Sequence, residues 1–414
     1  MFEGYGKLKQ RRVMMIQQGA RRNYIYARQL EAAGLLHSLV CDAAWPTGKV
    51  PLPVKLAERL VPRFAGPVAR RNVRGIEPSR IQASLLPNAA SFLKYLVSEE
   101  MAFALIDEVL ATTFRKRSLK GVDVIVNYLG NGGSFLKYAK RRGVKIATDF
   151  ISLPNYWEIL ATERSLWPGW EPEKTSASNN IVYQKRVSDL VSLSDVYLCP
   201  SKNVADALAD IPGFDVSRVR TVPYGVSGVK LLAPRTQRGR VLLAASVASV
   251  TKGIPYLAQA ARILKSRRPE VEIVVAGSAS AAIRARPETC DLTFLGVLDR
   301  ERMADEFAKA DIFCLPSLAE GSATVIFEAM AFSIPIVTTA SSGSVVKDGV
   351  EGYIVPERDG VAIANAIMRI VDDRGLRTAM SRSAMETAAR YSDENCGTAF
   401  VSVIRELLQE IDAQ

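Results

Sequence analysis

The sequence predicts an α/β protein with two domains, each built on its own sheet. Its 414 residues leave room for two domains of ordinary size, and 48% apolar residues is typical of a globular chain. Short apolar runs of the kind that form buried strands alternate with helical patterns along the chain. Two of these strands end alike, since residues 195–201 read DVYLCPS and residues 311–317 read DIFCLPS. The repeated ending indicates two similar halves.

The first half opens with a strand–helix–strand pattern. We expect a strand at 12–18, a loop at 19–23 and a helix at 24–33 that ends at Gly34. The loop contains one glycine, Gly19, and lacks G-x-G-x-x-G, so a dinucleotide-binding fingerprint is not supported. Later elements are expected as strands at 122–127 and 144–148, the second ending at Asp149, helices at 134–142 and 183–194, and a strand that ends at Pro200.

Residues 43–120 are irregular and basic, because repeated prolines break any long helix. One stretch, 54–74, mixes apolar and basic side chains in an amphipathic pattern, which could lie on a membrane surface or pack on its own domain. A longer helix is expected at 91–114. The apolar members of the stretch are Val54, Leu56, Leu60, Val61 and Phe64, and the basic ones are Lys55, Arg59, Arg63, Arg70, Arg71 and Arg74.

The net charge of +11 is confined to the start of the chain. Residues 1–120 hold 20 Lys and Arg against 9 Asp and Glu, whereas the remainder balances at 34 against 34. Such a basic face favours an anionic membrane leaflet, an acidic glycan or nucleic acid, or serves only solubility. No known nucleic-acid motif is present and the aromatic residues are not interleaved with the basic runs, so we expect no nucleic-acid partner.

Cysteine, histidine and hydropathy exclude several classes of protein. The five cysteines are far apart and read as thiols of a reducing compartment, and His37 is the only histidine, which rules out a histidine triad or a multi-histidine metal centre. No run of eighteen apolar residues is present. The first twelve residues lack an apolar signal core. We therefore expect a cytoplasmic protein, which could associate with the inner face of the membrane.

The second half begins after a hinge-like segment at 219–226. A strand at 241–245 and a loop at 246–251 lead to Lys252, which opens a helix at 254–267. A lysine between a strand and a helix N-terminus is well placed to bind phosphate. A strand at 271–277 follows and ends at Gly277, in the position where open sheets bind ligands. A short apolar run spans 292–297, and helices are expected at 361–390 and 394–411.

The rest of the chain is organised around residues 311–356. A strand at 312–315 leads through a loop of small residues to a helix that starts at Thr324. The loop delivers free backbone N–H groups to the helix N-terminus, where an anion is favoured. Glu320 and Glu328 are eight residues apart, about 12 Å along an unbroken helix. This exceeds the ~5–9.5 Å of a hydrolytic carboxylate pair. We expect the two acids to hold different parts of one ligand.

This segment resembles the donor-nucleotide segment of glycosyltransferase family 4, in which two glutamates are separated by seven residues (E-x7-E) and the second lies in an EAMA-like helix that is followed by a proline. The matching residues are Glu320, Glu328, Ala329, Met330, Ala331 and Pro335. Further matches, in the order of the family, are VPYGV at 222–226, Lys252-Gly253, LPS at 315–317 and GVEGYIVP at 349–356.

Four positions depart from the family pattern. Ser333 stands where a glycine is usual, Val247 where a second phosphate-binding cation is usual, and Ala20 where a glycine usually follows Gly19. Asp149 stands at the end of a strand that commonly ends in a histidine near the reacting sugar. We expect Asp149 in the cleft, but its role cannot be carried over from the family.

The resemblance implies the GT-B architecture, two Rossmann-like domains that face each other across a cleft. The first domain would span 1–226 with the basic insert at 43–120 and bind the acceptor. The second would span 227–392 and bind a nucleotide sugar. The last helix, 393–414, would cross back to the first domain.

The activity implied is transfer of a sugar from a UDP- or GDP-sugar to a hydroxyl of a glycan or lipid-linked acceptor, with retention and without a metal. An epimerase or a phosphorylase on the same fold is the alternative, because a fold does not fix chemistry. The site would comprise Lys252 and the amides of Gly321, Ser322, Ala323 and Thr324 for the diphosphate, Glu328 for the ribose and Glu320 for the sugar. Gly19 and Gly277 would lie beside the nucleotide, and Asp149 joins Glu320 and Lys252 as a candidate catalytic residue in the cleft.

Overall fold

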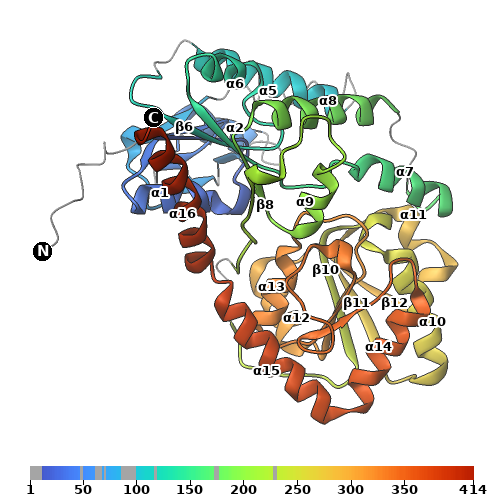
Figure 1. The fold of residues 1–414 in the computed structure, drawn as a ribbon. Coiled ribbons are helices and arrows are strands. Elements are labelled where there is room, and N and C mark those ends of the chain that lie inside the picture. Colours follow the sequence, from blue (N-terminus) through green and yellow to red (C-terminus); the bar gives the residue numbers. More distant parts are fainter. Residues whose placement is uncertain are drawn as a thin grey trace, which may run out of the picture.

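The computed structural model contains two parallel sheets, one in each half of the chain (Figure 1). The structure describes residues 12–46, 50–60, 68–69, 71–84, 99–115, 119–171, 177–226 and 231–414. The first sheet has the order β5-β2-β1-β6-β7-β8-β9. Its strands are β1 (Val13–Gln17), β2 (Leu36–Cys41), β5 (Ile81–Ala83), β6 (Val124–Tyr128), β7 (Lys145–Asp149), β8 (Val196–Cys199) and β9 (Val219–Thr221).

The second sheet has the order β12-β11-β10-β13-β14-β15. Both sheets are wound outward in two directions from their first strand, the arrangement that leaves a ligand crevice at the carboxyl ends of the central strands. The strands are β10 (Arg240–Ala248), β11 (Glu272–Ala279), β12 (Leu292–Gly296), β13 (Ile312–Leu315), β14 (Ile336–Thr338) and β15 (Gly352–Ile354). A small separate pair joins β3 (Trp45–Pro46) to β4 (Asn72–Val73).

Helices cover both faces of each sheet, so the central strands are buried on both sides, whereas the edge strands β5, β9 and β12 are partly exposed. In the first domain they are α1 (Ile25–Ala32), α2 (Leu52–Leu60), α5 (Glu99–Arg115), α6 (Gly133–Lys140), α8 (Ala177–Leu193) and α9 (Lys202–Leu208). In the second they are α10 (Ile254–Arg267), α11 (Ala281–Arg284), α12 (Arg300–Lys309), α13 (Thr324–Ala331), α14 (Gly360–Asp372) and α15 (Arg374–Arg390).

The last helix, α16 (Asp393–Asp412), returns from the second domain to the first (Figure 1). Phe400 stacks on Tyr26 of α1 with ring centroids 4.0 Å apart, and it is fully buried in the same core as the first sheet. Near the chain end, Arg12 donates to Asp412 at 2.7 Å and also pairs with Asp123. The helix therefore completes the core of the first domain.

A second segment also crosses between the domains, and it departs from the expected division of the chain at residue 226. The helix α7 (Tyr156–Leu166) and the turn after it follow β7 of the first domain, but they pack on the second. Trp170 is fully buried in the core of the second domain, and Leu160 joins it there. The second domain is thus assembled from two separate stretches of chain.

The predicted boundaries of helices and strands are correct where the apolar pattern and its flanking residues are clear. Helix α10 and strand β13 have the expected bounds, 254–267 and 312–315. The loop expected at 246–251 is wrong, because β10 continues to Ala248 after a register shift between Ala244 and Val247 against β11. The helix expected at 91–114 is described only from Glu99, and residues 85–98 lie outside the described part.

The basic amphipathic stretch is partly described. Helix α2 buries Val54 against Trp45, while Leu52, Leu56 and Leu60 are 78%, 56% and 73% exposed. Residues 61–67 and Arg70, which belong to the same predicted stretch, lie outside the described residues. No helix within the described ranges is both long enough and apolar enough to cross a bilayer.

Candidate functional site

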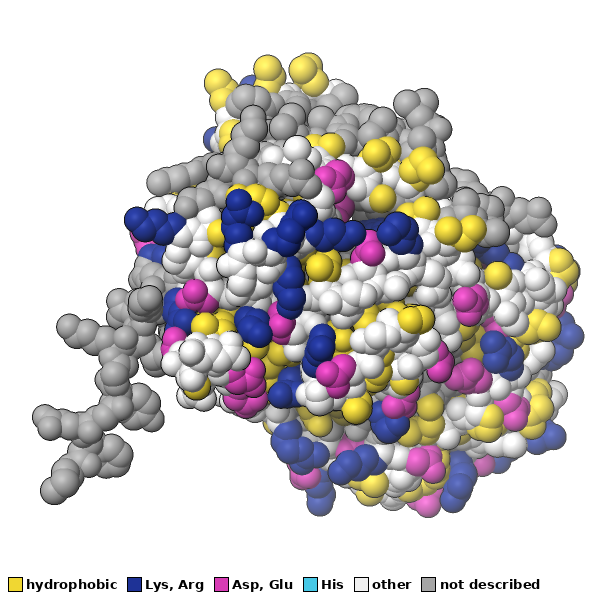
Figure 2. Space-filling view, turned by 45° about the horizontal axis from the view of Figure 1, so that its top comes forward, with side chains coloured by type: hydrophobic (Ala, Val, Ile, Leu, Met, Phe, Trp, Pro, Cys, Tyr) yellow, Lys and Arg dark blue, Asp and Glu magenta, His cyan; other side chains and the backbone are white. Residues whose placement is uncertain are grey.

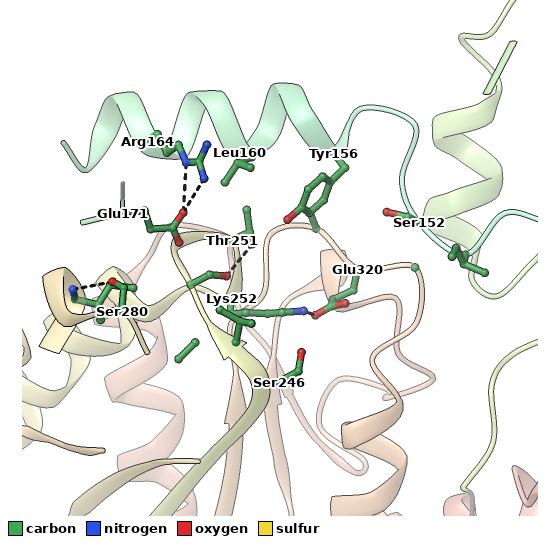
Figure 3. Close-up of a pocket in the computed structure, with 17 residues that line it drawn as sticks. Ser152, Tyr156, Leu160, Arg164, Glu171, Ser246, Thr251, Lys252, Ser280 and Glu320 are labelled. Carbon is green, nitrogen blue, oxygen red and sulfur yellow. Dashed lines mark hydrogen bonds and ion pairs between the residues drawn. The ribbon is translucent and has the colours of Figure 1, made fainter. Parts of the chain in front are cut away.

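A cavity of about 510 Å³ lies between α7, the end of β10 and the loop that precedes α13 (Figure 3). Both stretches of chain that build the second domain contribute to its wall, and Ile151 and Ser152 add the edge of the first domain. Its lining residues are Ile151, Ser152, Tyr156, Leu160, Arg164, Glu171, Ser246–Ser249, Thr251, Lys252, Ser280, Ile283 and Ala319–Gly321.

Lys252 and Glu320 form an ion pair inside this cavity (Figure 3). Lys252 ends the 3-10 turn Val250–Lys252, and Gly253 follows with φ of 76° so close to Pro316 that a Cβ would lie 2.1 Å from its carbonyl oxygen. Ser317 Oγ also donates to Glu320 Oε1, at 3.2 Å. Burial lowers the pKa of Lys252 to about 8. The lysine is therefore a poorly hydrated cation held ready in the cavity wall.

The start of α13 offers backbone donors, although fewer than predicted. The Ala323 N–H already donates to Ser342 O at 3.1 Å, so this amide is not available to a ligand. Among the described residues no hydrogen bond is formed by the N–H groups of Gly321, Ser322 and Thr324. The Ser322 hydroxyl is also buried without a partner in this part of the chain. Three amides and one hydroxyl thus remain to bind an anion at a helix N-terminus.

Gly321 lies where the two domains touch. A Cβ at this position would lie 2.0 Å from the carbonyl oxygen of Ile151, which is too close for any side chain. Glycine is therefore required by the closeness of the two backbones, and the same closeness brings the helix start to the cavity edge.

Glu328 lies on α13, partly buried and outside the cavity lining. Burial raises the pKa of its carboxyl, and Arg300 at the start of α12 opposes that rise. Glu320 lines the cavity from the loop before α13, whereas Glu328 does not line it. Its assignment to a ribose stays a prediction.

Gly277 and Gly19 do not line this cavity. Gly277 has φ of 133°, and a Cβ there would lie 1.9 Å from Ala245 O, so β11 needs glycine to pass beside the irregular part of β10. Gly19 has φ of 72° with open space around it, and its N–H donates to Asp42 Oδ1 at 2.8 Å. Their assigned places beside a nucleotide stay predictions.

Asp149 does not face the cavity, contrary to expectation. It is 1% exposed, and Tyr224 Oη donates to its two carboxylate oxygens at 2.9 and 3.1 Å. Burial raises the pKa of Asp149 to about 7, while the hydrogen bond from Tyr224 and the charge of Arg22 limit the rise. Its position indicates that Asp149 holds the segment that joins the two domains, and it does not support a catalytic role.

The sequence analysis did not predict that helix α7 forms one wall of the cavity. Tyr156, Leu160 and Arg164 recur every four residues, which marks one face of a helix, and Glu171 follows in the next turn. That spacing could have predicted the face, but no local signal shows that the face looks into the second domain.

One protein-family model matches part of this chain. Residues 238–373 match the family described as "Glycosyl transferases group 1". The matched stretch is 136 of the 414 residues and lies within the second domain. The match agrees with the resemblance to glycosyltransferase family 4 in Glu320, Glu328 and the residues around them. A D-inositol 3-phosphate glycosyltransferase of Xylanimonas cellulosilytica is 28% identical over 267 residues, which cover 58% of this chain and 62% of that protein.

Solved structures confirm the GT-B architecture that the sequence predicts. Sucrose-phosphate synthase from Thermosynechococcus elongatus superposes with a TM-score of 0.65 at 17% identity, over 97% of this chain and 100% of that one. Anabaena HepE, solved in complex with UDP and glucose, superposes with a TM-score of 0.57 at 15% identity, over 95% of this chain and 99% of that one. The likeness extends over both domains.

Proposed function

We propose that this protein transfers a sugar from a nucleoside diphosphate sugar to a hydroxyl group. The observation that carries the proposal is that Lys252 pairs with Glu320 in the loop that leads to α13, at a cavity lined by both domains. Three amides at the start of that helix form no hydrogen bond among the described residues. A lysine and a helix N-terminus together offer a diphosphate both charge and directed donors. The relatives' names support transfer over the epimerase or phosphorylase alternatives.

The donor would lie along the carboxyl edge of the second sheet. Lys252, Ser322 and the free amides would bind the diphosphate, Glu320 would accept hydrogen bonds from the sugar, and Glu328 from the ribose, because a carboxylate accepts from vicinal hydroxyls. We infer a UDP- or GDP-sugar, and a UDP complex of one structural neighbour supports the first. We infer that no metal is needed, because cationic side chains and the amides would supply the positive charge and the hydrogen-bond donors.

Transfer would proceed with retention at the anomeric carbon. The departing diphosphate accepts the proton of the incoming hydroxyl on the same face of the sugar, so no protein nucleophile is needed. The chain then contributes orientation and stabilisation of the charge that develops on the diphosphate. The observation behind this inference is that both carboxylates of the cavity lining are already paired, Glu320 with Lys252 and Glu171 with Arg164.

We infer that the acceptor is a glycan or lipid-linked hydroxyl, met at the first domain. Basic side chains gather on one face of that domain near exposed hydrophobic ones (Figure 2). On α2, Leu52, Leu56 and Leu60 follow one another along a face bordered by the exposed Lys55 and Arg59. Such a helix suits the inner, anionic leaflet of a cytoplasmic membrane.

The membrane proposal is tested by flotation with liposomes. Wild-type protein should float with vesicles that contain anionic lipid, and the double variant Leu56→Ser/Leu60→Ser should stay with the soluble fraction. Equal partition of wild type on neutral and anionic vesicles would contradict it. Leu166→Ser is a matched control, because Leu166 is 54% exposed but lies on α7.

The central proposal is tested in two steps. A thermal-shift panel of nucleoside diphosphate sugars should identify a ligand that raises the melting temperature, since a ligand that binds only the folded state stabilises it. Incubation of that donor, labelled in the sugar, with candidate acceptors should then release free nucleotide and a labelled product. An isomerised donor, or no response to any nucleoside diphosphate, would overturn the proposal.

A further inference from the structure

Two cations, not one, line the cavity, and each is bound to a carboxylate (Figure 3). Lys252 pairs with Glu320, as described above. Arg164 on α7 pairs with Glu171, whose Oε2 accepts from both Nε and Nη2 of the guanidinium at 3.3 Å. The charged residues of the lining are therefore two neutral pairs on facing walls.

Arg164 lies on helix α7, which is fixed to the second domain, and the second domain also carries Lys252. The neighbouring Glu163 is 0% exposed, and its carboxylate accepts from Tyr256 Oη at 2.7 Å and from Arg358 Nε at 2.7 Å. Trp167 Nε1 donates to the same Tyr256 hydroxyl at 2.9 Å. Buried charged hydrogen bonds of this kind fix geometry tightly. Helix α7 consequently keeps its place beside the second domain if the cleft opens.

Glu171 joins Arg164 to the turn that carries Lys252. Its Oε1 accepts from the Val250 N–H at 2.8 Å, at the first residue of the turn Val250–Lys252, while Oε2 holds Arg164. One carboxylate thus positions both cations. The hydrogen bond to the Val250 amide alone would not require an arginine beside Glu171. The second interaction of Glu171 therefore serves to hold Arg164 at the cavity wall.

A diphosphate carries more than one negative charge, and Lys252 supplies a single positive charge. Lys252 is partly neutralised by Glu320, and the strand residue that faces the cavity nearby, Val247, is 52% exposed and uncharged. Arginine binds phosphate with two parallel hydrogen bonds, which a lysine cannot form. Arg164 is the remaining cation of this lining.

We propose that Arg164 is a phosphate-binding residue of the nucleotide-sugar site, which acts as a second cation beside Lys252 and is positioned by Glu171. The proposal rests on the proposed function and adds a residue to its site. In the unliganded protein the guanidinium is held by Glu171, and it turns to the diphosphate when the donor enters. Helix α7 then forms the outer wall of the donor site.

The test compares ligands with and without phosphate. For whichever nucleoside diphosphate the wild type binds, Arg164→Ala should weaken binding roughly 10- to 150-fold by calorimetry, the range for one lost charged hydrogen-bonding group. Binding of the matching nucleoside, followed by ligand-observed NMR titration, should be unchanged. Arg164→Lys should recover part of the lost affinity, because lysine restores the positive charge but not the two parallel hydrogen bonds of a guanidinium.

The matched control is Arg286→Ala. Arg286 lies over the Trp170 ring and donates to Pro168 O at 3.3 Å, so it packs on the same segment, but it does not line the cavity. Diphosphate affinity equal to wild type in Arg164→Ala would overturn the inference, as would an equal loss for diphosphate and nucleoside. A wild type that binds no nucleoside diphosphate would instead overturn the proposed function.

Discussion

Lys252 and Glu320 are bound to each other in the unliganded cavity. They come from turns after two neighbouring strands, β10 and β13, and are 68 residues apart in the chain. A ligand that binds either residue must therefore displace the other residue of the pair. If Lys252 binds the diphosphate and Glu320 the sugar, as proposed, donor binding must break this pair, and the cost of breaking it enters the affinity for every nucleotide sugar.

Replacing Glu320 by Gln should separate binding from transfer. The variant frees Lys252 from its partner, so calorimetry should show nucleoside diphosphate bound at least as tightly as by wild type. The rate of transfer should fall, because the carboxylate that orients the sugar is lost. Ser317→Ala is the control, since it removes a 3.2 Å hydrogen bond to Glu320 but no charge. A variant with weaker diphosphate binding and an unchanged rate would reverse the assignment.

The affinity for nucleoside diphosphate should depend on pH through Lys252. An anion binds the protonated lysine, and the pKa of this group in the free protein is lowered to about 8 by burial. Binding strength is therefore fully present below pH 8 and is lost as the pH rises through that value. Titrations between pH 6.5 and 9 measure it, and Lys252→Arg should flatten the profile because a guanidinium stays charged. An identical slope in both proteins would exclude Lys252 as its source.

Glu328→Ala should weaken nucleotide binding through the ribose. Loss of one charged hydrogen-bonding group costs roughly 1.5–3 kcal/mol. The informative measurement compares a ribonucleoside diphosphate with its 2′,3′-dideoxy analogue. Wild type should prefer the former, and the variant should bind both alike. If Glu328→Ala binds the ribonucleotide as tightly as wild type, the assignment fails.

Asp149→Asn should change the pH dependence of stability. The folded-state pKa of Asp149 is raised to about 7, above its value in the unfolded chain, so its contribution to stability is present at low pH and lost as the pH rises toward 7. Asparagine keeps an acceptor for Tyr224 and removes this loss. Denaturant titrations at pH 5 and pH 8 should show a smaller difference for the variant. Equal differences would mean that Asp149 is ionised with its ordinary pKa.

Transfer should survive removal of divalent metal. The proposed diphosphate site uses Lys252, Arg164 and main-chain amides, which need no bridging ion. Activity after dialysis against EDTA should equal that of untreated enzyme, and added Mg²⁺ should not raise it. A requirement for metal would show that these donors do not suffice.

The sequence predicted those parts of the site that local signals encode. The strand, small-residue loop and helix around Glu320 lie where expected, since proline, glycine and apolar spacing mark their ends. The start of α10 after Lys252-Gly253 was predicted for the same reason, whereas the end of β10 was not. Contacts between distant parts of the chain were not predictable in this way. Glu171 holds Val250 across 79 residues, and Tyr224 buries Asp149 across 75, and neither has a periodic signature.

The attachment of α7 to the second domain limits how the two lobes can be exchanged or isolated. A fragment that begins at residue 231 would lack Trp170 and Glu163, so the hollow that Trp170 fills would open to water and Arg358 would lose its buried partner. A chimera built to alter donor choice must therefore transplant residues 156–171 together with the later lobe. Splicing at one junction alone would leave an incomplete hydrophobic core.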